Sequence, residues 1–148
     1  MDKGFLEMKS KMILDRYLEF DKDETEYYEW LIKVFHLVPS LDWNLVKIPE
    51  FEFSYGDNKI HLRREYIKQE SPYLPIDLRI ELAKRIEKEQ FEDPYLGYGD
   101  YRLPNFVHDG KDFYIVDLQG FAIAPPEKRR VKFDKNFGNY LRTNRNEV

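Results

Sequence analysis

The stretch from Tyr98 to Gly120, YGDYRLPNFVHDGKDFYIVDLQG, constrains the fold of this chain more than any other part of the sequence. Two short apolar runs, NFV and DFYIVD, flank the dipeptide Asp109–Gly110, and Asp-Gly in that setting is the strongest local signal for a β-hairpin. A hairpin brings its two ends together, so we expect Asn105 and Asp117 at its open end, with Asp100 in the loop just upstream. Such a cluster of oxygen-bearing side chains is suited to a hard cation or a phosphate-bound metal.

Hydrophobic periodicity elsewhere predicts a mixed α+β fold. Apolar residues recur at helical spacing in residues 23–38 and 76–90, which predicts two helices. We expect Asp23 to cap the first helix and Asp77 to cap the second. Residues 45–67 instead alternate with period two on either side of the turn GDN, which predicts a second hairpin.

The two ends of the chain carry weaker patterns. Residues 5–20 permit either a helix or a short strand around FLEMK, and the abundance of good helix formers favours the helix. The segment 124–148 begins with prolines and is rich in lysine and arginine. We expect this tail to be a solvated basic surface, with nucleic-acid binding as the lesser alternative.

Composition excludes several classes of function. The chain has no cysteine, so disulfides, thiolate zinc sites and cysteine nucleophiles are excluded, and a reducing compartment fits. Its 24 basic and 28 acidic residues give a net charge of only −4, which does not favour nucleic-acid or membrane partners. No signal-peptide pattern is found, and no apolar run reaches the ~20 residues that span a bilayer. We expect a soluble, cytoplasmic protein.

The motifs GDYRLPN and YIVDLQG resemble the catalytic loop and the metal-binding loop of the protein-kinase-like superfamily, including its aminoglycoside phosphotransferase branch. The resemblance implies that Asp100 orients the substrate hydroxyl or accepts its proton. It also implies that Asn105 and Asp117 hold Mg²⁺ against the phosphates of ATP. Arg102 stands where many relatives have a basic residue near the transferred phosphate.

The order of the upstream elements extends this resemblance. The helix predicted over 23–38 resembles the N-lobe helix whose early glutamate pairs with the nucleotide-binding lysine, and Glu24 takes that position. If FLEMK is a strand, Lys9 is the matching lysine and Lys11 is the second choice. If the segment is helical, that lysine is missing.

The resemblance also implies a hinge and a division of the chain. LRREYIK resembles the hinge after the fifth N-lobe strand, where backbone groups of Glu65 and Ile67 would contact adenine. The implied fold is a single kinase-like domain. It has a reduced N-lobe over about residues 1–67 and a truncated C-lobe, containing the catalytic-loop hairpin, over 68–148.

The implied activity is an ATP- and Mg²⁺-dependent transfer of the γ-phosphate to an unknown hydroxyl acceptor. The alternative is a pseudokinase that acts as a binding or regulatory module. The lack of a glycine-rich loop before residue 23 favours this alternative, whereas the complete Asp–Asn–Asp set favours the enzyme. The sequence also permits a protein partner that completes the nucleotide lid. A third alternative is a basic-tailed adaptor without a nucleotide site.

Overall fold

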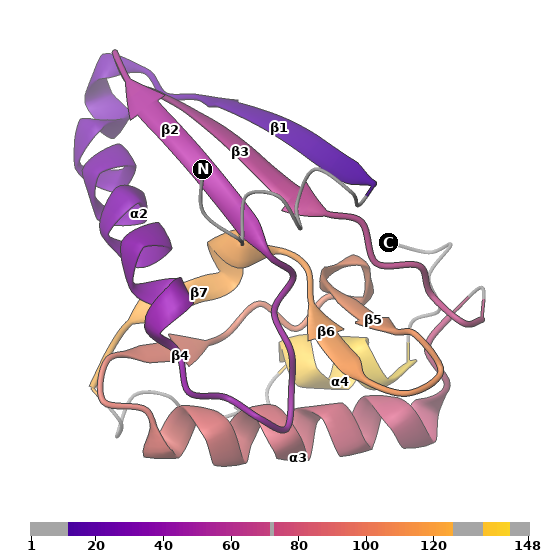
Figure 1. The fold of residues 1–148 in the computed structure, drawn as a ribbon. Coiled ribbons are helices and arrows are strands. Elements are labelled where there is room, and N and C mark those ends of the chain that lie inside the picture. The colour runs from indigo at the N-terminus through magenta and orange to yellow at the C-terminus, as the bar shows by residue number, and fades with distance from the viewer. Residues whose placement is uncertain (1–11, 72, 126–134, 143–148) are drawn as a thin grey trace.

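The structure, a computed structural model, describes residues 12–71, 73–125 and 135–142 (Figure 1). The helices and strands of these ranges are β1 (Ile13–Glu19), α2 (Thr25–Leu37), β2 (Phe51–Gly56), β3 (Lys59–Glu65), α3 (Ile76–Glu92), β4 (Leu96–Tyr98), β5 (Phe106–His108), β6 (Phe113–Ile115), β7 (Phe121–Ile123) and α4 (Lys135–Arg142). The expected α+β class is confirmed in the form of small antiparallel sheets with few helices. None of the described helices combines the length and the hydrophobicity needed to cross a membrane.

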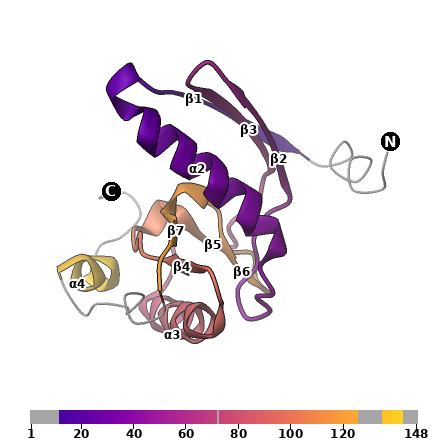
Figure 2. The same cartoon turned by 90° about the vertical axis from the view of Figure 1, so that its left-hand side faces the viewer.

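The largest sheet is antiparallel, with strand order β1-β3-β2, and α2 packs along one of its faces (Figures 1 and 2). The hairpin expected within residues 45–67 is confirmed as β2 and β3. Its turn is formed by Asp57 and Asn58, which both have positive φ, as the tightest hairpin turns require. On the face that meets α2, the ring of Phe35 lies 5.5 Å from that of Phe53, between ring centroids.

Residues 13–19 form the edge strand β1, so the helix expected over 5–20 is wrong for its described part, and residues 5–11 lie outside the described residues. β1 pairs along its whole length with β3, from Ile13↔Glu65 to Glu19↔Lys59. Good helix formers were outweighed by this ladder because a distant partner strand satisfies the backbone groups of β1.

The α2 helix lies where its periodicity predicts, but Asp23 does not cap it. A short 3-10 turn, Lys22–Glu24, precedes α2, and the Glu24 side chain accepts a hydrogen bond from the Asp21 N–H at 2.9 Å. The cap therefore lies one turn earlier than expected, because the chain turns into the 3-10 segment before the α-helix begins.

The α3 helix is likewise confirmed, and the expected cap at Asp77 is wrong. Pro75 occupies the N-cap position, and its carbonyl accepts the first helical bond from the Arg79 N–H at 2.9 Å. Asp77 lies inside the first turn, where its negative charge is still favoured by the helix dipole.

Two short ladders lie between the large sheet and α3 (Figure 1). The hairpin expected around Asp109–Gly110 is confirmed as β5 and β6, paired from Phe106↔Ile115 to His108↔Phe113. The Asp109 carboxylate accepts the N–H groups of Lys111 and Asp112, at 2.9 and 2.7 Å, which closes the loop. β4 pairs with β7 beside this hairpin.

A continuous core joins these layers, and it reaches the C-terminal helix α4. The sequence predicts a solvated basic tail, but Tyr140 of α4 is only 1% exposed and belongs to the core. α4 lies beside α3 in both views (Figures 1 and 2). The buried ring of Tyr140, together with Leu141 packed against the core, thus anchors α4 to the rest of the fold.

Candidate functional site

The polar residues of the 98–120 stretch meet at the open end of the β5–β6 hairpin. Asn105 ends a 3-10 turn directly before β5, and its carbonyl accepts the N–H of Val116, just before Asp117, at 2.8 Å. The Asn105 side-chain Nδ2 donates to the carbonyl of Asp100 at 3.0 Å. We call the group Asp100, Arg102, Asn105 and Asp117 the polar rim.

Asn105 and Asp117 present oxygen atoms at this rim. Asn105 is only 5% exposed, its Nδ2 is used by the bond to Asp100, and among the described residues no hydrogen bond is made to its Oδ1. The Asp117 Oδ1 accepts the Gln119 N–H at 3.0 Å, which orients the carboxylate. An amide oxygen and a carboxylate are donors that Mg²⁺ prefers, so this pair fits the implied metal.

Arg102 holds the carboxylate of Asp100 through two bonds. The Nε and Nη2 atoms of Arg102 each lie 2.9 Å from a different carboxylate oxygen of Asp100. The hydrogen bond and charge of Asp100 raise the pKa of Arg102, and the charge of Asp117 acts in the same direction. Arg102 thus forms an ion pair with Asp100 and is also stabilised in its charged form by Asp117.

Tyr98 lies next to the polar rim and binds the backbone of Asp117. Its hydroxyl donates to the Asp117 carbonyl at 3.0 Å, and its ring is 2% exposed. Burial raises the pKa of Tyr98 well above its ordinary value, and the charges of Asp117 and Asp100 raise it further. The hydroxyl therefore stays protonated and acts as a fixed donor that positions the backbone of Asp117.

Two arginines of the large sheet also face the rim, and the sequence reasoning missed both. Arg16 on β1 is paired with Leu62 of β3, which is buried, so the Arg16 side chain lies on the inner face of the sheet. Its Nη1 is 3.9 Å from the Asp117 Oδ1. Arg64 lies on the same face, and burial together with the charge of Arg16 lowers its pKa, which Asp117 partly offsets.

Arginine and aspartate side chains from the sheet and from the rim thus lie near one another. Arg16 lies beside the carboxylate of Asp117, and Arg64 is influenced by the charges of both residues. A strand over ILDRYLE would have placed Arg16 on one face with Leu14 and Leu18, but the only strand considered for residues 5–20 was the one around FLEMK.

The other expected site residues are Lys9, Glu24, Glu65 and Ile67. Lys9 is outside the described residues, so its pairing with Glu24 stays a prediction, and Glu24 is an exposed residue before α2. At the expected hinge, the Glu65 N–H donates to the Glu50 carbonyl at 2.9 Å. Ile67 lies just beyond β3 and lines a small pocket of about 490 Å³.

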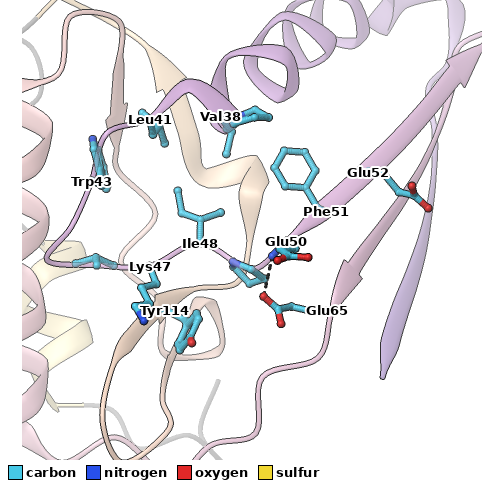
Figure 3. A pocket seen from close by; sticks show the side chains of 13 residues that line it. Val38, Leu41, Trp43, Lys47, Ile48, Glu50, Phe51, Glu52, Glu65 and Tyr114 are labelled. Carbon is cyan, nitrogen blue, oxygen red and sulfur yellow. Dashed lines mark hydrogen bonds between the residues drawn. The ribbon is translucent and has the colours of Figure 1, made fainter. Parts of the chain in front are cut away.

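A larger pocket of about 760 Å³ lies between the segment after α2 and β6 (Figure 3). Its wall includes the apolar side chains of Val38, Leu41, Trp43, Ile48 and Phe51. Glu65 accepts a hydrogen bond from the Glu50 N–H at 2.8 Å along its edge. Its polar side chains are those of Lys47, Glu50, Glu52, Glu65 and Tyr114.

No family model matches the chain, and searches of curated proteins and of solved structures likewise find no match.

Proposed function

We propose that the polar rim is the phosphate and metal end of a kinase-like nucleotide site, and that the protein transfers the γ-phosphoryl group of ATP to a hydroxyl acceptor. The observation that carries this proposal is the meeting of Arg16, from the sheet, with Asp117 at the hairpin end that also holds Asn105. The proposed fold is accordingly kinase-like.

The donor set supports the metal assignment. Asn105 Oδ1 and the Asp117 carboxylate would hold Mg²⁺, which when bound neutralises charge on the nucleotide phosphates. Arg16 and Arg64 supply the cationic side chains of the sheet, so the role that the resemblance gave to Lys9 falls to Arg16 among the described residues. Arginine is suited to this role because its guanidinium binds phosphate oxygens in pairs.

Asp100 and Arg102 supply the groups nearest the transferred phosphate. The acceptor oxygen attacks the γ-phosphorus, the bond from phosphorus to the leaving ADP oxygen breaks, and the hydroxyl proton passes to the Asp100 carboxylate. Arg102, held beside that carboxylate, would stabilise the charge on the transferred group. Positioning and charge neutralisation account for this mechanism without a covalent intermediate on the protein.

The second candidate is a nucleotide-binding module without transfer activity, and one observation favours it. Both carboxylate oxygens of Asp100 are bound by Arg102 at 2.9 Å. The lone pairs that point at the guanidinium are occupied by its N–H donors. The pair must therefore open, or share a lone pair with the substrate, before Asp100 acts as a base.

Binding is tested by thermal unfolding of the wild type and of Asp117→Asn with ATP, with and without Mg²⁺. A ligand at 100 times its Kd stabilises the folded state by ~2.7 kcal/mol, so the wild type should gain stability that depends on the metal. Asp117→Asn should lose that gain, whereas Asp42→Asn, at an exposed residue outside the polar rim, should keep it. An equal gain in all three proteins, or none in the wild type, would contradict the proposal.

Transfer is tested with labelled ATP and the variant Asp100→Ala. Because Asp100 has no part in holding the nucleotide, binding should persist while phosphoryl transfer falls roughly 10²-fold or more. Wild-type protein that binds Mg²⁺–ATP but never turns it over, with a range of hydroxyl acceptors supplied, would support the second candidate. Turnover that Asp100→Ala leaves unchanged would remove Asp100 from the mechanism.

A further inference from the structure

The C-terminal helix α4 is held by a buried arginine. Arg79 of α3 is only 2% exposed, and its Nη1 donates to the carbonyls of Tyr140 and Leu141, at 3.2 and 2.8 Å. Carbonyls in the last turn of a helix lack partners within the helix, and a cation there also complements the helix dipole. In return, the Tyr140 hydroxyl donates to the Arg79 carbonyl at 3.1 Å. The two residues clamp α4 onto α3.

Tyr140 extends this clamp to the loop that carries the polar rim. Its ring lies 5.8 Å from the ring of Tyr101 and 5.5 Å from that of Phe106, between centroids, in edge-to-face arrangements at 71° and 77°. Tyr101 directly follows Asp100, and Phe106 directly follows Asn105. One side chain of α4 thus contacts both ends of the segment that positions these two rim residues.

We infer that α4 is a positioning element for the polar rim, in which Tyr140, clamped by Arg79, fixes the backbone from Asp100 to Asn105. An isolated helix as short as α4, Lys135–Arg142, is unstable in water, so α4 forms only where it docks. Docking and the order of the 98–106 loop are then linked. By the reciprocity of linkage, a ligand that orders the rim also favours docked α4.

A pair of variants at Asn139 tests the inference without removing a buried side chain. Asn139 is exposed within α4, so Asn139→Pro should break the helix, whereas Asn139→Ala preserves it. The measurement is amide hydrogen exchange of the full chain. In Asn139→Pro, the Asn105 N–H, which donates to the Arg102 carbonyl at 3.0 Å, should exchange roughly tenfold faster or more.

The comparison with the large sheet separates positioning from general stability. Positioning predicts that amides of β2 and β3 exchange at wild-type rates in Asn139→Pro, while those of 98–106 accelerate. A uniform acceleration of both regions, or unchanged exchange in 98–106, would overturn the inference. Tyr140→Ala should reproduce the local effect, and Tyr95→Ala, at a tyrosine that is 59% exposed, should not.

The reciprocal measurement rests on the proposed function. If Mg²⁺–ATP binds the rim, its addition to the wild type should slow exchange of the α4 amides, and Asp117→Asn should abolish that slowing. If Mg²⁺–ATP does not bind at all, the proposed function fails while the Asn139 comparison still decides the role of α4. Binding that leaves α4 exchange unchanged would overturn the coupling alone.

Discussion

Gly120→Ala is the substitution for which the structure predicts the sharpest steric effect. A Cβ added at Gly120 would lie 2.4 Å from Cζ of Tyr98 and 2.5 Å from both its Cε1 and its hydroxyl oxygen. The Tyr98 ring has little room to yield, because it packs against Phe121 at 4.9 Å and Phe106 at 5.8 Å, between ring centroids. One methyl group must therefore displace a buried ring.

Two free-energy costs determine how much Gly120→Ala destabilises the folded protein. Overpacking of a filled core costs ~1–3 kcal/mol. Displacement of the ring also removes the hydrogen bond from the Tyr98 hydroxyl to the Asp117 carbonyl, worth ~1 kcal/mol. We expect Gly120→Ala to lower the free energy of unfolding by about 2–4 kcal/mol, and its Tm by roughly 5–15 °C for a domain of this size.

Urea unfolding of the wild type, the two glycine variants, Tyr98→Leu and the Tyr98→Leu/Gly120→Ala double variant checks this reasoning. Gly56→Ala is the matched control, since nothing lies within 4 Å of a Cβ at that position, and it should change stability by less than ~0.5 kcal/mol. The cost of Gly120→Ala should fall to less than ~1 kcal/mol in a Tyr98→Leu background, where the clashing atoms are gone. A Gly120→Ala protein as stable as the wild type, or an equal cost in both backgrounds, would refute the steric argument.

Three further predictions concern buried and turn residues. Asn58→Ala should lower the free energy of unfolding by about 1–3 kcal/mol, because the φ of residue 58 is 56° and the Nδ2 hydrogen bonds to Asp21 and Thr25 are lost. Asn58→Gly should lose less stability in chemical denaturation, because glycine adopts this φ without strain. Gln90→Leu should cost ~1–3 kcal/mol in the same assay, since it leaves the buried Tyr98 N–H without its acceptor. Hydrogen bonds from the N–H groups of Asp112 and Lys111 lower the pKa of Asp109 below its ordinary value of 3.8. The ionised carboxylate therefore stabilises the folded state at pH values above 3.8, and this stabilisation is lost as the pH falls through the folded-state pKa. The stability gap between the wild type and Asp109→Asn should therefore close in acid denaturation profiles, and a gap that is constant with pH would contradict this assignment.

The candidate site could be predicted only where its residues are close in sequence. The convergence of Asn105 and Asp117 follows from the hairpin, because Asp109–Gly110 fixes the turn and the turn fixes which residues meet at its open end. Arg16 could not be assigned to the site in the same way. Its position beside Asp117 depends on the pairing of β1 with β3 and on how the whole sheet lies over the hairpin.

Elements with a strong local signal could be predicted from the amino-acid sequence. The apolar face of α2, the alternation in β2 and β3, and the turn residues Asp57 and Asn58 each specify a structure through neighbours a few positions away. In each of these elements, the local backbone preference and the pattern of buried side chains specify the same conformation, so tertiary contacts do not change it.

The elements at the two ends of the described residues depend instead on long-range contacts. Residues 13–19 have the composition of a helix but form an edge strand, because β3 offers them a complete ladder. In α4, Phe137, Tyr140 and Leu141 recur at helical spacing within a basic tail, and the helix is held by the buried Tyr140 and by Arg79 from a distant helix. In both cases the stabilising partner is far away in sequence. The free energy that selects the conformation therefore does not exist until the rest of the chain has folded.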